Sequence, residues 1–165
     1  MQHEAPSSEA HAARCISRID DYVYVAGHLA AADPDVLAAN RITHVLCLGV
    51  AHPRHPGVEY MQLRIMCGDE PGVDLAAAAP LALAFILRAA ARRGRVLIHC
   101  RLGVSRSPAV AAVYLMTVYM MSLGDALAGL RAARPFISIN RGLMSYIHQL
   151  EAARLLVDLA PAIKN

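Results

Sequence analysis

The spacing of hydrophobic residues changes along this chain, from short apolar runs to longer helical patterns. A short, continuously apolar run predicts a buried strand, and strict alternation of apolar and polar residues predicts a half-buried one. Longer segments with apolar positions three and four residues apart predict helices. The predicted strands are 16–19, 22–25, 43–48, 59–65 and 96–99, and the predicted long helices are 75–93, 107–119, 121–134 and 140–159.

Three of the predicted helices begin after a residue that can accept hydrogen bonds from the first turn. Asp33 precedes Pro34, and proline suits the first helical position because its missing N–H is not needed there. This pair predicts a short helix between the second and third strands. The candidate caps of two longer helices are Asp74 and Ser122.

The order of these elements predicts an α/β domain. Strands come early and alternate with helices, and three helices close the chain, so the strands are expected to form a central sheet. The 165 residues are enough for one domain with a sizeable core. Residues 1–13 hold few large apolar groups and are expected to be mobile with at most a helical turn, which assigns 14–160 to the domain and 161–165 to a tail.

Composition and charge narrow the class of protein. Hydrophobic residues make up 56% of the chain, but much of this is alanine, and the longest apolar stretches are interrupted or too short to cross a bilayer. The N-terminal residues lack the apolar core of a signal peptide, so a cytoplasmic protein with four reduced cysteines is expected. A net charge of +3 does not by itself indicate nucleic acid, but a mildly basic surface favours anionic substrates.

The strongest chemical signal is segment 99–108, His-Cys-Arg-Leu-Gly-Val-Ser-Arg-Ser-Pro, which follows the buried strand 96–99. A loop between a strand and a helix is an anion site, because the helix N-terminus offers unpaired N–H groups and the positive end of its dipole. The pKa of the Cys100 thiol is expected to fall there, while Arg106 adds a planar fork for two phosphate oxygens. Gly103 lets the backbone bend inward.

This pattern predicts a thiolate that attacks a bound tetrahedral phosphate and forms a cysteinyl-phosphate. No set of cysteines and histidines has the spacing of a zinc site, so neither a metal nor a cofactor is expected. The residues expected to bind the phosphate are Arg101, Leu102, Gly103, Val104, Ser105 and Arg106.

The same segment resembles the signature of the protein tyrosine phosphatase superfamily, and its ending resembles the small, atypical dual-specificity phosphatases of vertebrates and poxviruses. The likeness extends from about residue 16 to about residue 150 and includes segments 22–27, 114–116, 121–126 and 134–135. It implies the fold of that superfamily, in which a central, mostly parallel twisted sheet is flanked by helices. The phosphate-binding loop then lies between a central strand and a helix.

A phosphate monoester needs a protonated leaving group, so a carboxylic acid is expected near the loop. Residues 63–75 resemble the acid loop of the family, and Asp69 takes the position of its aspartate. The resemblance implies that Asp69 protonates the leaving oxygen and then activates the water that hydrolyses the phosphocysteine. Glu70 is the alternative acid, whereas Asp74 suits the cap of the following helix.

Three further residues have supporting roles. The resemblance implies that Ser107 hydrogen-bonds the Cys100 sulfur when it leaves in the second step, and a simple helix cap is compatible with this. His99 is expected to hold the loop by hydrogen bonds rather than to transfer protons. Asn140 is implied to tie the loop through backbone hydrogen bonds, with a plain N-cap of the last helix as the alternative.

The same residues bear on the molecule that carries the phosphate. The resemblance and the short chain imply a shallow pocket that admits phosphoserine and phosphothreonine as well as phosphotyrosine, so phosphorylated proteins are the expected partners. Arg101 places a basic side chain at the rim, which keeps phosphoinositides or RNA 5′-phosphates as alternative substrates. An inactive phosphate-binding module is a third alternative, and a monomer and a homodimer both stay open.

Two other cysteines bear on oxidation. Cys47 lies on a strand expected beside that of Cys100, where related phosphatases can form a protective disulfide, and ordinary burial is the alternative. Cys67 precedes the acid loop.

Overall fold

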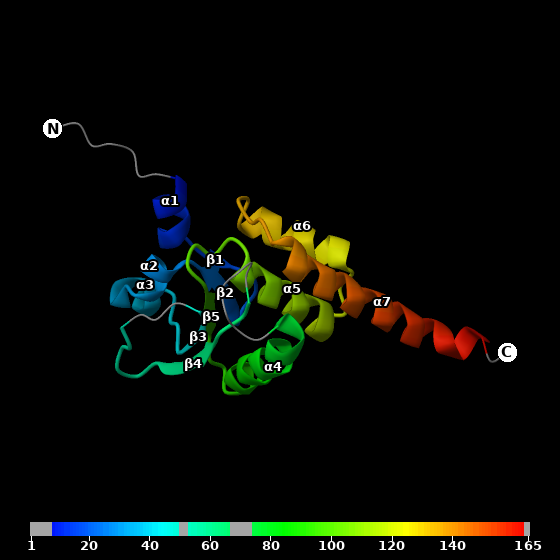
Figure 1. The fold of residues 1–165 in the computed structure, drawn as a ribbon. Coiled ribbons are helices and arrows are strands. Elements are labelled where there is room, and N and C mark those ends of the chain that lie inside the picture. The colour runs from blue at the N-terminus through cyan, green and yellow to red at the C-terminus, as the bar shows by residue number, and fades with distance from the viewer. Residues whose placement is uncertain (1–7, 50–52, 67–73, 164–165) are drawn as a thin grey trace.

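The structure is a computed structural model that describes residues 8–49, 53–66 and 74–163. At its centre is a five-stranded sheet in the order β1-β2-β5-β3-β4 (Figure 1). β1 is antiparallel to β2 and the other neighbouring strands are parallel, which confirms the α/β fold with a mostly parallel sheet. The strands are β1 Ile16–Arg18, β2 Val23–Ala26, β3 His44–Leu48, β4 Glu59–Leu63 and β5 Val96–His99.

Helices cover both faces of this sheet (Figure 1). Alternate residues of β2 point to opposite faces. Tyr24 packs with the short helices α2 (His28–Ala31) and α3 (Pro34–Ala39), while Val25 packs with α4 (Leu75–Ala91) and α5 (Arg106–Val118). β5 is buried along its whole length, as its continuous apolar run predicts. The helices are α1 Ser8–Arg14, α2 His28–Ala31, α3 Pro34–Ala39, α4 Leu75–Ala91, α5 Arg106–Val118, α6 Leu123–Ala133 and α7 Arg141–Ile163.

The three predicted caps are confirmed. The Asp33 side chain accepts hydrogen bonds from two N–H groups of the first turn of α3. Asp74 accepts one from Ala77 at the start of α4, and Ser122 accepts one from Asp125 at the start of α6. Each cap satisfies N–H groups that the helix itself leaves unpaired.

The N-terminal helix α1 is longer than the single turn expected from the sequence. Its residues Ala12 and Ala13 are buried, and α1 lies so close to Gly27 that a Cβ there would sit 2.4 Å from the Cα of Ala13. α1 therefore packs closely on the start of α2, although the limits of the domain at residues 14 and 160 stay predictions. Within the described ranges, no helix is both long enough and apolar enough to cross a membrane.

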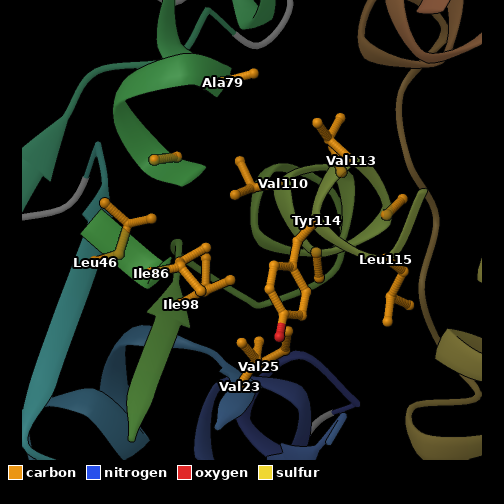
Figure 2. Close-up of a cluster of buried hydrophobic side chains, with 14 of the residues drawn as sticks. Val23, Val25, Leu46, Ala79, Ile86, Ile98, Val110, Val113, Tyr114 and Leu115 are labelled. Atoms are coloured by element: carbon orange, nitrogen blue, oxygen red, sulfur yellow. The ribbon is translucent and has the colours of Figure 1, made fainter. Parts of the chain in front are cut away.

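Helix α5 runs through the middle of the molecule, and its first eleven residues are buried. Figure 2 shows Val110 and Tyr114 of α5 among side chains from the sheet and α4, including Val25, Ile86 and Ile98. Burial on all sides explains why the sequence of α5 is apolar around its whole circumference. The N-terminus of α5 is thereby fixed directly behind the end of β5.

The far end of α5 is held by a carboxylate. Asp20, in the turn between β1 and β2, accepts hydrogen bonds from the hydroxyls of Tyr114 and Tyr119 at 2.8 and 2.9 Å. Its other oxygen accepts the backbone N–H groups of Tyr22 and Val23. Burial, the Tyr119 hydroxyl and the Asp20 charge raise the pKa of Tyr114, so this phenol stays protonated as a donor. The contact fixes α5 along its axis relative to β2.

Candidate active site

The segment with the strongest sequence signal forms a loop at the C-terminal end of β5. β5 ends at His99, and α5 begins at Arg106. β5 lies between β2 and β3, so the loop emerges at the centre of the sheet. The first turn of α5 directs its N–H groups and the positive end of its dipole at this loop. The position expected from the sequence, between a central strand and a helix, is confirmed.

The two ends of the loop are held through outward-pointing carbonyl groups. The Arg101 carbonyl accepts hydrogen bonds from the backbone N–H and the ring Nδ1 of His28, at 3.0 and 2.7 Å. The Val104 carbonyl accepts one from the N–H of Ser138 at 2.8 Å. His28 begins α2 and Ser138 lies between α6 and α7, so elements on two sides fix the loop.

The two carbonyls between these ends are held by Arg134. Its Nη2 binds the Leu102 carbonyl at 3.1 Å, and its Nε binds the Gly103 carbonyl at 2.6 Å. Since the C=O and N–H of a trans peptide point in opposite directions, the N–H groups that follow these carbonyls turn toward the inside of the loop. The Gly103 N–H accordingly reaches the Cys100 sulfur at 3.2 Å. Such a ring of inward N–H groups is a binding site for an anion.

Gly103 is required by its surroundings. Its φ is +69°, and a Cβ would lie 2.6 Å from the carbonyl carbon and oxygen of Ala26 and 2.5 Å from Nη2 of Arg134. A side chain at this position would therefore strain the backbone and displace the loop or the guanidinium.

The Cys100 side chain lies inside the loop and is 3% exposed. Its sulfur lies 3.3 Å from the hydroxyl of Ser107 and accepts the Gly103 N–H. Burial alone raises the pKa of the Cys100 thiol. The hydrogen bonds from Ser107 and Gly103 and the charge of Arg106 outweigh burial, so the pKa lies below its ordinary value. The lowered pKa agrees with the sequence prediction.

The Arg106 side chain is 7% exposed, which is unusual for an arginine. It reaches the end of β3, where Gly49 has a φ of +96°. A Cβ on Gly49 would lie 2.5 Å from Nη1 of Arg106. The missing side chain therefore makes room for the guanidinium, and Gly49 is a supporting residue that the sequence alone did not single out.

The supporting residues lie around the loop. His99 is fully buried, and its Nδ1 lies 3.4 Å from the Cys100 carbonyl. The Asn140 N–H donates to the Ser105 hydroxyl at 3.0 Å, while its side-chain oxygen accepts the N–H of Leu143 at 2.9 Å. The Asn140 side chain thus caps α7, while its contact with the loop is made by the backbone N–H, so a specific role of this asparagine in tying the loop stays a prediction.

The expected acid lies outside the described residues. This holds for Asp69, for the alternative acid Glu70 and for Cys67, which fall in the segment between Met66 and Asp74. Asp74 itself caps α4, so its carboxylate already has a structural partner. The choice between Asp69 and Glu70 stays a prediction.

A cavity of about 560 Å³ lies where α4 and α7 begin, and none of the loop residues 100–106 is among its described lining residues. Asn140, whose N–H binds the loop, is one of its lining residues. The lining is largely apolar and includes Met66, Asp74, Leu75, Leu143 and Tyr146.

Cys47 lies in β3 next to β5, and its register partner in β5 is His99. It is buried, and neither Cys47 nor Cys100 forms a disulfide bond within the described part of the chain. The choice between ordinary burial of Cys47 and a protective disulfide with Cys100 therefore stays a prediction.

Replacing Ser107 with alanine is expected to move the pH dependence of Cys100 reactivity to higher pH. Alkylation requires the thiolate form of Cys100. The lowered pKa of this thiol therefore keeps Cys100 reactive at acidic pH. Removing the Ser107 hydroxyl raises the pKa again, because one of the bonds that stabilise the thiolate is lost. At a pH below the thiol pKa, alkylation by iodoacetamide should fall about tenfold, the worth of one such hydrogen bond, and should recover at alkaline pH.

The alkylation rate is measured from pH 4 to pH 10 on both proteins. Thr117→Ala removes an exposed hydroxyl from the same helix and should leave the profile unchanged. An identical profile for Ser107→Ala and the wild type would contradict the assignment of Ser107.

Comparison with known proteins agrees with this site. Residues 23–153 match the family model described as dual specificity phosphatase, catalytic domain. The chain is 31% identical over 141 residues to dual specificity protein phosphatase 22-B of Danio rerio, which covers 85% of this chain and 76% of that protein. It is 28% identical over 146 residues to protein-tyrosine-phosphatase MKP1 of Arabidopsis thaliana, covering 88% of this chain but only 19% of that longer protein.

Among solved structures, a mouse putative dual specificity phosphatase complexed with zinc tungstate superposes with a TM-score of 0.78. The two chains share 26% sequence identity, and the match covers 99% of this chain and 96% of the mouse chain. The chain therefore belongs to the dual specificity phosphatase family and is a cysteine-dependent protein phosphatase.

Proposed function

We propose that Cys100 is the nucleophile of a dual-specificity phosphatase and that the loop 100–106 binds the phosphate group of its substrate. The observation that carries this proposal is the geometry of the loop. Its carbonyl groups are hydrogen-bonded from outside, so its N–H groups face inward around the Cys100 sulfur. A tetrahedral dianion fits this ring, because each N–H that faces inward can donate to one of its oxygens. The lowered pKa of Cys100 supplies the thiolate.

In the first step, the Cys100 sulfur forms a bond to phosphorus as the bond from phosphorus to the substrate oxygen breaks. The leaving oxygen takes a proton from Asp69, or from Glu70 if that residue is the acid. In the second step, a water molecule attacks phosphorus after losing its proton to the same carboxylate, and the Cys100 thiolate leaves. Ser107, at 3.3 Å from the sulfur, stabilises that thiolate by a hydrogen bond.

Arg106 binds the phosphate, in addition to lowering the pKa of Cys100 through its charge. Its fork of N–H donors matches two phosphate oxygens, and its charge offsets the charge that develops as the phosphoryl group is transferred. Gly49 supports this role by leaving space beside the guanidinium. His99, Ser105 and Asn140 hold the loop in its shape.

The substrates that we propose are phosphorylated proteins, with phosphotyrosine and phosphoserine or phosphothreonine both accepted. The match to the dual specificity phosphatase family supports this choice, and the largely apolar cavity at the starts of α4 and α7 offers a space for a peptide side chain. A phosphoinositide or an RNA 5′-phosphate is the second candidate, on the observation that the Arg101 side chain is exposed next to the nucleophile. Light scattering distinguishes the monomer from the homodimer, the two oligomeric states predicted for the protein.

The test is phosphate release from a phosphotyrosine peptide, a phosphothreonine peptide and a phosphoinositide, by the wild type and by Asp69→Asn and Glu70→Gln. Both peptides are expected to be hydrolysed, and Asp69→Asn is expected to lower kcat by about 10² to 10⁴, the usual contribution of a general acid. The loss should be largest for phosphothreonine, because its alkoxide is the poorer leaving group, and small for an activated aryl phosphate. Glu70→Gln serves as the matched control.

Hydrolysis of phosphotyrosine alone would overturn the dual specificity. A larger loss in Glu70→Gln than in Asp69→Asn would move the acid to Glu70. Faster turnover of the phosphoinositide than of both peptides, lost in Arg101→Ala, would favour the second candidate.

A further inference from the structure

Arg134 is a buried arginine that holds two carbonyls of the loop and also binds the N-terminal part of the chain. It is the first residue after α6 and is 1% exposed. A guanidinium cannot give up its proton at physiological pH, so burying it requires partners for its charge and its N–H groups. Within the described part of the chain, its hydrogen-bond partners are neutral oxygens.

These partners use every N–H donor of the side chain. Nε and Nη2 bind the carbonyls of Gly103 and Leu102 in the catalytic loop. The other bonds go to the N-terminal part of the chain, and the Phe136 ring centroid lies 4.5 Å from the guanidinium carbon. The N-terminal acceptors are Ala12 O at 2.8 Å, Cys15 O at 3.0 Å and the Ser17 hydroxyl at 3.2 Å.

The bonds on the loop side have a direct consequence for the nucleophile. The Leu102 carbonyl belongs to the peptide whose N–H is that of Gly103, and the Gly103 carbonyl belongs to the peptide whose N–H is that of Val104. Holding the two carbonyls outward therefore holds both N–H groups inward. One of them donates to the Cys100 sulfur at 3.2 Å.

We propose that Arg134 is a positioning residue of the phosphatase reaction, which orients the Gly103 and Val104 N–H groups toward Cys100 and the phosphate. The inference rests on the proposed role of Cys100 and of the loop. Because the same guanidinium also binds α1 and β1, the seating of the N-terminal helix and the geometry of the loop are coupled.

Replacing Arg134 with lysine distinguishes a positioning role of this residue from a purely structural one. Arg134→Lys keeps the charge and most of the volume, but its single ammonium cannot bind the two loop carbonyls and the N-terminal carbonyls together. The matched control is Arg131→Lys, the same change at an exposed position one turn earlier on α6. Folding of each protein is followed by circular dichroism and thermal unfolding.

Two readouts are measured on folded protein. The first is kcat/KM on a phosphotyrosine peptide, expected to fall by about 100-fold, since a misplacement of 1 Å at a reacting centre has effects of that size. The second is alkylation of Cys100 by anionic iodoacetate relative to neutral iodoacetamide, with the site mapped by mass spectrometry. The ring of N–H groups attracts the carboxylate of iodoacetate, so the ratio is expected to fall about tenfold in Arg134→Lys, the worth of about one lost charge-assisted hydrogen bond. Both readouts should be unchanged in Arg131→Lys.

The alkylation ratio needs no turnover, so it distinguishes failure of this inference from failure of the proposed function. Folded Arg134→Lys with a lower melting temperature but an unchanged ratio and kcat/KM would show that Arg134 is structural only. If Arg134→Lys does not fold, Ser17→Ala replaces it, because it removes a single acceptor of Nη1. The expected result is then a severalfold fall in both readouts, and no change would overturn the proposal.

Discussion

Replacing Cys100 by serine is expected to lower kcat/KM for every phosphorylated substrate by at least about 10⁴-fold, as the loss of a covalent nucleophile does in other enzymes. The loop stabilises a thiolate through Ser107, Gly103 and Arg106. A serine hydroxyl in the same place stays protonated, so it is a poor nucleophile even with the same donors around it. Phosphate release from phosphotyrosine and phosphothreonine peptides measures the loss.

Binding of phosphate is expected to survive this substitution. The inward N–H groups depend on hydrogen bonds from Arg134, His28 and Ser138 to loop carbonyls, and none of these bonds involves the Cys100 side chain. Calorimetry with a phosphopeptide should therefore give a Kd close to that of the wild type. Cys47→Ala, which removes another buried thiol, should keep its activity, as should the wild type in a chelator. Turnover that persists in Cys100→Ser would exclude the cysteinyl-phosphate.

The features that could be predicted from the sequence are determined by residues that lie close together along the chain. The strand 96–99 is recognisable because both of its faces are covered, which makes the apolar run continuous. The caps Asp33 and Ser122 are recognisable because a cap acts on N–H groups two or three residues away. The loop after His99 lies between a continuously apolar strand and the start of a helix, so these two local patterns were enough to predict its position.

The parts that could not be predicted depend on contacts between distant segments. Arg134 belongs to a segment that resembles the family, yet the hydrogen-bond partners of its side chain lie 31 to 122 residues away in sequence, and no local pattern indicates them. Gly49 looks like an ordinary residue at a strand end until the Arg106 guanidinium is placed beside it. The single turn of α2 and the packing of α1 were missed for the same reason, since short alanine-rich helices carry little apolar pattern of their own.

Replacing Arg106 by lysine is expected to lower kcat/KM by about 10³-fold, within the range lost when an arginine that stabilises phosphoryl transfer is removed. The charge is kept, so the pKa of Cys100 should rise less than it does in Arg106→Met. The paired donors are lost, however, and a single ammonium cannot bind two phosphate oxygens in one plane. Steady-state kinetics and the pH dependence of thiol alkylation, measured on the same samples, separate the two contributions.

The geometry at Gly49 provides an independent way to perturb the same guanidinium. Gly49→Ala puts a methyl group 2.5 Å from Nη1 of Arg106, so it should lower kcat/KM in the same direction while the charge and the arginine remain. Arg92→Met removes a positive charge from an exposed position at the end of α4 and serves as the control for Arg106→Met.

The outcome for Arg106→Lys decides how Arg106 acts. If Arg106→Lys kept more than about a tenth of the wild-type kcat/KM, Arg106 would act mainly through its charge, because loss of a fork that stabilises the transition state exceeds a factor of ten.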